Sequence, residues 1–127
     1  MIYTEHREEE YRVKFYLDTQ TNKSPVKEYI DRLTAKEKAK ILKYIDFLRE
    51  NRGMLDEPYS KHITGKIREL RVDFSANRHR IFYFTFINKT IILLHAFLKK
   101  TAKTPIQEIK RAENRIEDVF LNKGIYE

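Results

Sequence analysis

The sequence predicts an α+β domain, in which two N-terminal helices pack on a twisted, mainly antiparallel β-sheet and a C-terminal helix follows. Two patterns support this fold class. Apolar residues recur at helical spacing in residues 25–48 and 104–120, whereas residues 11–17 and 67–98 alternate or form short β-rich apolar runs. Because 127 residues suit one core, residues 1–127 are interpreted as a single domain.

The first strand is expected at residues 11–17, where apolar and polar side chains alternate. Ser24 and Pro25 then provide an N-cap and a proline at the first helical position, where the missing amide hydrogen costs nothing. A short helix should therefore begin at Pro25.

A capping box is predicted at Thr34-Ala-Lys-Glu37, in which Thr34 accepts from a first-turn amide and Glu37 reaches back to the amide of Thr34. Gly53 is expected to end this second helix as its C′ residue. The apolar stripe between them consists of Ala39, Leu42, Ile45 and Leu48, flanked by Ile41, Tyr44 and Phe47. Both helices should pack against a sheet.

From Ile67 the apolar period changes to two, so Glu69, Arg71 and Asp73 share one face of a strand. Residues 78–87 are apolar on both faces beyond their basic start, which predicts a central strand that is covered on both sides.

A turn at Asn88-Lys89 would lead into the next strand at residues 90–98 and place position 80 opposite position 97. Four cations should therefore meet at one end of the sheet: Arg78, Arg80, Lys99 and Lys100. The segment 61–111 holds 12 Lys/Arg and 3 Asp/Glu, a net charge of +9 in a chain of net charge +7. Such a localised positive field predicts a nucleic-acid partner.

The last helix is expected to begin, with a cap, in the run Thr104-Pro105-Ile-Gln107. Its apolar stripe consists of Ile106, Ile109, Ile116, Val119 and Phe120.

Several classes of site and location are excluded or disfavoured. The chain has no cysteine, and its 4 histidines are far apart without carboxylates at ligand spacing, so no metal site and no cofactor are expected. Three glycines form no phosphate-binding loop. A secretory signal and a membrane-spanning run are also missing from the sequence, which favours a cytoplasmic location. What remains is metal-free chemistry on a phosphate, for which Arg, Lys and His are suited.

Each candidate residue also has a purely structural interpretation. Arg71 and Arg80 could pair with Glu69 or Asp73 instead of a phosphate, and His95 could be a hydrogen-bonded core histidine. Lys99-Lys100 could be solubilising charge, and the rings of Tyr83 and Phe97 could pack in the core instead of stacking on bases.

Three runs in order, Ile67-Arg-Glu-Leu-Arg71, Arg78-His-Arg-Ile-Phe-Tyr83 and His95-Ala-Phe-Leu-Lys-Lys-Thr101 with Lys103-Thr-Pro105, resemble the RelE/ParE toxin superfamily. Within it, the chain is most similar to the HigB-like, phage-derived branch. The resemblance implies a RelE-like fold and a toxin of a type II toxin–antitoxin pair. Its implied partners are a cognate antitoxin, often with a HigA-like helix-turn-helix domain, and mRNA on the ribosome.

The resemblance also implies a mechanism: attack of the RNA 2′-hydroxyl on the adjacent phosphate by a metal-independent endoribonuclease, an mRNA interferase. Arg71 and Arg80 would clamp the phosphate, and Lys99 and Lys100 would stabilise charge or assist the leaving oxygen. His95 is the candidate base or acid, because its ordinary pKa near 6.5 allows either role. Further RNA contacts are expected from Arg68, Arg78, Lys103, Tyr83 and Phe97. A RelE-type catalytic tyrosine on a loose tail is missing, so the acid–base pair stays open.

Two rival functions use the same sequence. A ParE-like toxin would act on DNA gyrase without nucleolytic residues, which leaves the cations without a chemical task. A non-catalytic nucleic-acid-binding subunit would use the cations only to contact phosphates, so their substitution would weaken binding and its salt dependence.

Overall fold

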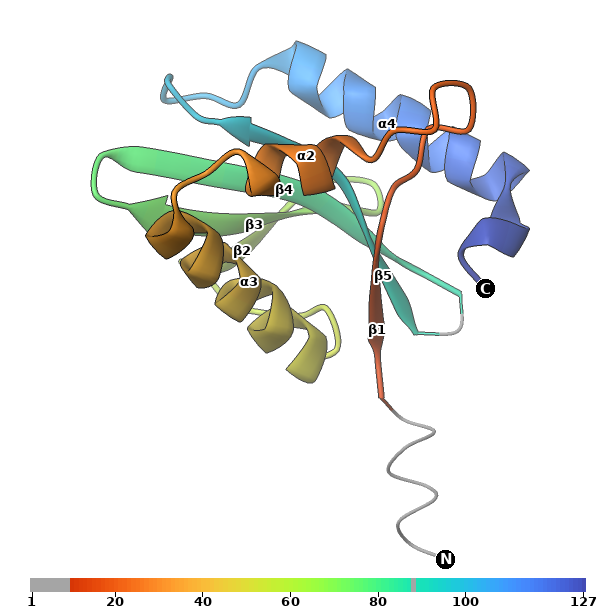
Figure 1. Cartoon of the computed structure of the whole chain (residues 1–127), viewed down its shortest axis with the longest axis horizontal. Helices are drawn as coiled ribbons and strands as arrows, with labels where there is room; N and C mark the ends of the chain where they lie inside the picture. The colour runs from red at the N-terminus through yellow and green to blue at the C-terminus, as the bar shows by residue number, and fades with distance from the viewer. Residues whose placement is uncertain (1–9, 88) are drawn as a thin grey trace, which may run out of the picture.

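The computed structural model describes residues 10–87 and 89–127 as an α+β domain, which confirms the predicted fold class (Figure 1). The elements in chain order are β1 (Arg12–Phe15), α2 (Pro25–Asp31), α3 (Ala35–Glu50), β2 (Ser60–Thr64), β3 (Ile67–Phe74), β4 (Asn77–Phe86), β5 (Thr90–Leu98), α4 (Ile106–Leu121) and the 3₁₀ helix η1 (Lys123–Ile125). One five-stranded sheet has the order β1-β5-β4-β3-β2, and only the β1–β5 pair is parallel.

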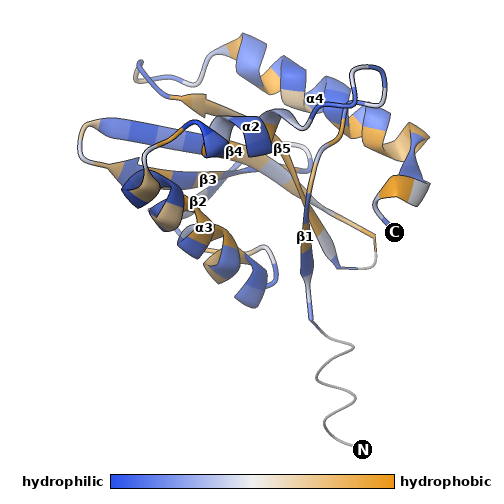
Figure 2. Ribbon diagram, in the orientation of Figure 1, coloured by the Kyte–Doolittle hydropathy of each residue, from blue (hydrophilic) through white to orange (hydrophobic). Residues whose placement is uncertain are grey.

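The sheet separates two apolar layers. On one face, Ile81 and Tyr83 of β4 pack with α2 and α3, and on the other face Phe82 and Phe84 pack with α4. The middle of the sheet, where β4 and β5 pair, is accordingly hydrophobic (Figure 2). The prediction that residues 78–87 form a central strand covered on both sides is therefore confirmed.

The β4–β5 hairpin has the expected register at its basic end, because Arg80 lies opposite Phe97. Next to the turn the register differs from the prediction by one residue, because Phe86 instead of Ile87 lies opposite Thr90. A register shift between Phe82 and Tyr83 offsets this difference, so the predicted pairing holds only at the basic end. Of the two predicted turn residues, Asn88 lies outside the described residues.

One of the two hydrogen bonds predicted for the capping box of α3 is formed. The Thr34 hydroxyl accepts from the amide of Glu37 at 3.3 Å, but the Glu37 carboxylate does not return to the Thr34 amide. Its Oε2 atom instead accepts from Asn77 Nδ2 at 2.9 Å and from His79 Nε2 at 2.8 Å. Hydrogen bonds from Asn77 and His79 lower the pKa of Glu37, so this buried carboxylate joins α3 to the start of β4.

The buried stripe of α3 is rotated from the predicted one. Ile41, Ile45 and Leu48 face the sheet, whereas Ala39 and Leu42 are exposed. The seven apolar residues of the predicted stripe cover too wide an arc of the helix for one contact surface. The buried row begins with a carboxylate, Glu37. Spacing alone did not show that a carboxylate begins this row.

The end of α3 also differs from the prediction by one residue. Asn51 is the C-cap, Arg52 takes the left-handed C′ conformation with φ of 59°, and Gly53 follows with φ of 79°. The Gly53 amide donates to Leu48 at 2.9 Å. A Cβ atom on Gly53 would lie 2.8 Å from Thr85 Oγ1, so the close approach to β4 favours glycine here.

The caps predicted before α2 and α4 are not formed by side chains. Ser24 is the N-cap residue of α2, but its hydroxyl donates to the Tyr16 carbonyl at 3.2 Å. Helix α4 begins at Ile106 with Pro105 as N-cap, and Ile106 is 70% exposed. The inner face of α4 is formed by Ile109, Ala112, Ile116 and Val119.

Candidate functional site

Four cations gather on the α4 side of the sheet, at the end where β4 begins and β5 ends. This cationic cluster consists of Arg71 of β3, Arg78 and Arg80 of β4, and Lys99 just after β5. Arg71 and Arg80 are direct cross-strand partners, and the Lys99 amide donates to the Arg78 carbonyl at 2.8 Å. The pairing of β3, β4 and β5 therefore brings together three runs that are separated in the sequence.

The side chain of Lys99 is surrounded by like charges. Its pKa lies below the ordinary lysine value, first because of burial and further because of Arg80, Arg71 and Arg78. Glu69 opposes this shift. A lysine with a lowered pKa gives up its proton more readily than an exposed lysine, as a proton donor must.

Two carboxylates pair with the arginines of the cluster. Glu69 Oε1 accepts from Arg71 Nε at 2.9 Å, and Asp73 Oδ1 accepts from Arg80 Nη1 at 2.8 Å. The ion pairs considered as an alternative from the sequence are therefore present. Neither carboxylate was assigned to the site, although the alternation of β3 had placed both on the same face as Arg71.

The pairing within the cluster is incomplete. Arg80 Nε and Glu69 Oε2 are buried and have no hydrogen-bond partner among residues 10–87 and 89–127. A buried polar atom without a partner costs free energy, so each such atom calls for an explanation such as a ligand that binds there.

His95 lies beneath α4, next to the cluster but not in it. Arg115 Nη1 donates to its Nδ1 atom at 3.1 Å, and its Nε2–H donates to Glu108 Oε1 at 2.8 Å. The ring stacks on Phe97 with centroids 5.6 Å apart. Burial, helped by Arg115, lowers the pKa of His95 despite the opposing hydrogen bond to Glu108. His95 thus has the geometry of a hydrogen-bonded core histidine, which was the structural interpretation that the sequence left open.

The neutral state of His95 predicts a specific loss of stability in acid. Its folded-state pKa is below the ordinary value of about 6.5, so the unfolded chain binds more protons between the two values. The free energy of unfolding contributed by His95 is therefore present above about pH 6.5 and lost as the pH falls toward the folded-state pKa. Urea unfolding of His95→Gln should depend less on pH than that of the native chain in this window.

The matched control for this prediction is His62→Gln, because His62 is exposed. This variant should keep the pH dependence of the native chain. An unchanged dependence in His95→Gln would contradict the assignment.

Three of the predicted cations lie at the surface. Arg78 of the cluster is exposed, and so are Lys100 and Lys103, which are outside the cluster in the segment that follows β5. Phe97 lies on the face of the cluster but is buried at 7% exposure and packs edge-on against Phe82. Phe97 therefore supports the site from below.

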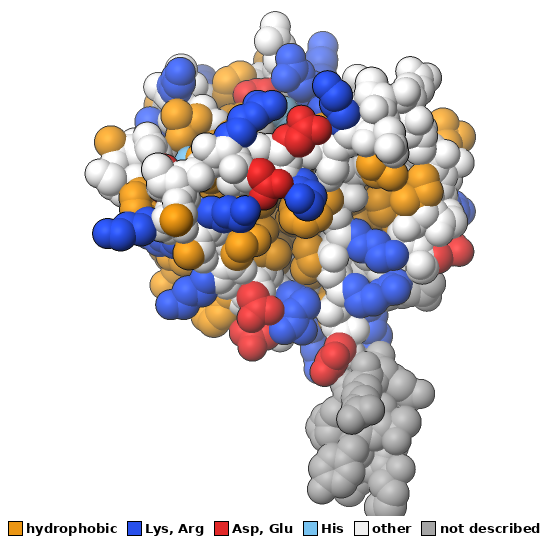
Figure 3. Space-filling model, in the orientation of Figure 1, with side chains coloured by type: hydrophobic (Ala, Val, Ile, Leu, Met, Phe, Trp, Pro, Cys, Tyr) orange, Lys and Arg blue, Asp and Glu red, His pale blue; other side chains and the backbone are white. Residues whose placement is uncertain are grey.

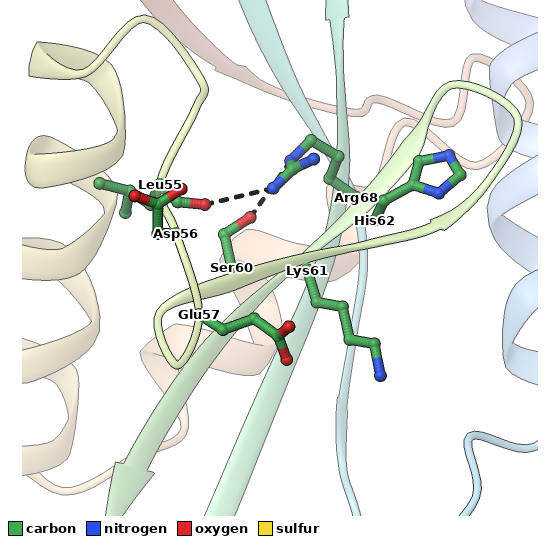
Figure 4. Close-up of a pocket in the computed structure, with 7 residues that line it drawn as sticks. All are labelled: Leu55, Asp56, Glu57, Ser60, Lys61, His62 and Arg68. Carbon is green, nitrogen blue, oxygen red and sulfur yellow. Dashed lines mark hydrogen bonds between the residues drawn. The ribbon is translucent and has the colours of Figure 1, made fainter.

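Arg68 and Tyr83 lie on the opposite face of the sheet. Arg68 donates to Leu55 O at 3.2 Å and to Ser60 Oγ at 3.3 Å, in a pocket beside β2 (Figure 4). The Tyr83 hydroxyl donates to Gly53 O at 3.0 Å, and its ring has no exposed surface. Neither side chain joins the cationic cluster, and Tyr83 offers no surface to an RNA base.

The surface around α2 differs from the cluster. On the face seen in Figure 3, basic and acidic side chains are interspersed. Asp31, for example, accepts from both Lys27 and Lys38 at 2.9 Å. Exposed pairs of this kind contribute little free energy.

Two further features of the described residues concern metal ions and the membrane. In residues 10–87 and 89–127, no three His, Asp or Glu side chains are placed to hold a metal ion. Within the same ranges, no helix has the length and apolarity needed to cross a membrane.

A protein-family comparison decides the family. Residues 28–117 match the model described as phage derived protein Gp49-like (DUF891). The chain belongs to the Gp49-like family. No curated protein matches the sequence significantly. The Gp49-like match runs from α2 into α4, so it includes Glu69, His95 and all four residues of the cationic cluster.

Proposed function

We propose that this Gp49-like protein is the toxin of a type II toxin–antitoxin system and cleaves mRNA on the ribosome as a metal-independent endoribonuclease. Three observations support the proposal: the sequence resemblance to the RelE/ParE superfamily and its HigB-like branch, the membership of the Gp49-like family, and the cationic cluster. The partners in this proposal are a HigA-like antitoxin and translated mRNA.

The unpaired donor in the cluster carries the proposal. Like charges directly opposite on a sheet are destabilising, and Arg71 lies directly opposite Arg80. Arg80 Nε is a buried donor without an acceptor in the described part of the chain. A phosphate would offset the repulsion and supply the acceptor, since guanidinium groups bind phosphate oxygens in pairs.

The chemistry follows from the positions of the cations. The RNA 2′-oxygen attacks the adjacent phosphorus, and the bond from phosphorus to the 5′-oxygen breaks. Arg71 and Arg80 stabilise the charge that develops on the non-bridging oxygens, while Lys99 donates a proton to the leaving 5′-oxygen. The 2′-hydroxyl proton passes to solvent, and the products are a 2′,3′-cyclic phosphate and a 5′-hydroxyl.

His95 has a different task in this mechanism from the one that the sequence suggested. Both of its ring nitrogens have partners in α4, so proton transfer would require one of these hydrogen bonds to break. We assign it the support of Phe97, on which it stacks, and of the sheet beneath the cluster. Lys100, Lys103 and Arg78 contribute positive charge that attracts the RNA backbone.

The ribosome would orient the substrate. The two aromatic side chains that line the α4 face near the cluster, Phe82 and Phe97, are buried and cannot stack on a base. Cations alone hold the backbone without fixing the 2′-hydroxyl in line with the leaving oxygen, and such orientation supplies much of the rate.

The test is to add purified protein to translating ribosomes and map new RNA 5′ ends and their chemistry. We expect cuts within translated codons that leave 5′-hydroxyl ends. His95→Ala and Lys100→Ala should cut at the same codons with lower yield. Intact mRNA under conditions in which the protein still arrests growth would overturn the proposal and favour gyrase or another target.

A further inference from the structure

Glu69 occupies an unusual position for a carboxylate. It lies on β3 opposite Phe82 of β4, beneath the cationic cluster, and its side chain has no exposed surface. Its Oε1 atom accepts from Arg71 Nε at 2.9 Å. Its Oε2 atom has no hydrogen-bond partner in the described residues. The carboxylate is therefore buried and only half satisfied.

Stability does not account for this carboxylate. Removing an ionised group from water is costly, and one ion pair rarely recovers the cost unless the remaining lone pairs are satisfied. An apolar residue could pack against Phe82 at this position without that cost, as Ile67 does earlier on the same face. The charge at position 69 is better explained by its effect on its neighbours.

Two members of the cluster face Glu69. Arg71 is held by the hydrogen bond from its Nε–H to Glu69 Oε1. The other is Lys99, whose backbone amide donates to Arg78 and whose pKa is influenced by four charged groups, Glu69 and Arg71 of β3 and Arg78 and Arg80 of β4. Glu69 is the one acidic group in that set, and the three arginines all favour loss of the Lys99 proton. Asp73 lies opposite Arg78 on the same face, and its carboxylate is paired with Arg80.

We propose that Glu69 is a positioning residue of the ribonuclease site, whose buried carboxylate orients Arg71 and balances the arginines that surround Lys99. This inference rests on the proposed function. The inference adds Glu69 to the proposed mechanism as the residue that keeps the proton donor, Lys99, charged until the leaving oxygen takes its proton.

The chain offers a matched control in Glu57. Its Oε1 atom lies 3.7 Å from Arg71 Nη1, but its side chain is 65% exposed. Glu57 and Glu69 are thus two carboxylates beside one arginine, of which one is buried and the other is in water. Solvent screens the exposed charge, so Glu57→Gln should leave Lys99 and the cleavage rate unchanged.

The experiment has two independent readouts on Glu69→Gln and Glu57→Gln. The first is the NMR titration of Lys99 in protein labelled with ¹³C at lysine Cε, with the signal assigned from Lys99→Arg. The second is the pH dependence of mRNA cleavage on ribosomes. In Glu69→Gln we expect Lys99 to lose its proton at lower pH, and cleavage to fall roughly 10- to 100-fold with its alkaline limb displaced in the same direction.

A second variant separates the two roles of Glu69 and covers the case in which Glu69→Gln does not fold. Glu69→Asp keeps the charge but is one methylene too short to reach Arg71 in the same way. Its Lys99 titration should remain near that of the native chain, while the Arg71 Nε–H signal loses its protection from solvent exchange and cleavage falls.

The results that would reject the role of Glu69 differ from the result that would reject the proposed ribonuclease. An unchanged Lys99 titration in Glu69→Gln, or an equal shift in Glu57→Gln, would overturn the role of Glu69. If Glu69→Gln does not fold, unchanged Arg71 Nε–H protection and unchanged cleavage in Glu69→Asp would overturn it. A shifted titration in a protein that cuts no RNA would leave Glu69 as the counter-charge of Lys99 and reject the ribonuclease.

Discussion

Replacing Lys99 with methionine is expected to lower the rate of ribosome-dependent mRNA cleavage about 10²- to 10⁴-fold, the usual contribution of a positioned acid or base. Burial and, further, three arginines lower the pKa of Lys99, so this residue combines a positive charge with a proton that can be given up. Methionine retains the length of the side chain and removes both properties. Single-turnover cleavage on programmed ribosomes measures the effect.

Two comparison variants give this prediction its specificity. Lys99→Arg keeps the charge but does not release a proton near neutral pH, so it should bind RNA and still cleave slowly. Lys100→Met changes the exposed neighbour and should reduce the rate far less. Equal losses in Lys99→Met and Lys100→Met, or full activity in Lys99→Arg, would show that Lys99 supplies only general positive charge.

Replacing Phe82 with alanine is expected to reduce the free energy of unfolding by about 3–5 kcal/mol, as for other large aromatic residues in cores. Phe82 has no exposed surface and packs edge-on against Phe97 at a centroid distance of 5.2 Å. It also lies opposite both Glu69 and His95 in the sheet. The cavity would therefore open directly below the proposed site. Urea unfolding followed by circular dichroism measures the change.

The matched control is Phe47→Ala on α3. Phe47 is 46% exposed, so the same truncation there leaves little cavity and should cost less than half as much. Comparable losses at positions 47 and 82 would contradict the two-layer core described above. We also expect Phe82→Ala to lose cleavage activity at a lower temperature than Phe47→Ala.

Only part of the basic end of the β4–β5 hairpin could be predicted from local rules. Side chains alternate along a strand, and a short turn sets which residues lie opposite each other. These rules brought Arg78 and Lys99 to one end of the sheet, as observed. The pairing of Arg80 with Phe97 also matches the prediction, but the observed turn pairs Phe86 instead of Ile87 with Thr90, and the register shift between Phe82 and Tyr83 offsets that difference. Whether these cations perform the proposed chemistry remains a prediction.

Other candidate residues depended on contacts that no local pattern contains. The partners of His95 come from α4, and Arg68 binds Leu55 and Ser60 on the opposite face of the sheet. In the sequence Tyr83 is one of several apolar residues of its strand. In the structure its hydroxyl donates a hydrogen bond to the Gly53 carbonyl in the core. Strand alternation assigned these residues to one face of the sheet or the other. Which helix or loop covers each face, and therefore which partners these residues have, is decided by the tertiary structure.

The sequence by itself determined the α+β class, the strand ends that meet at the basic end of the sheet and the concentration of positive charge, since period and composition are properties of short segments. Tertiary structure decided which charges are buried and what they face. Glu69 could be named from alternation as a possible partner of Arg71, but its burial and its influence on Lys99 require β3, β4 and β5 to be assembled. Burial depends on the whole folded chain. Because the Glu69–Arg71 ion pair is formed by a buried carboxylate and not at an open surface, it is a candidate part of a functional site.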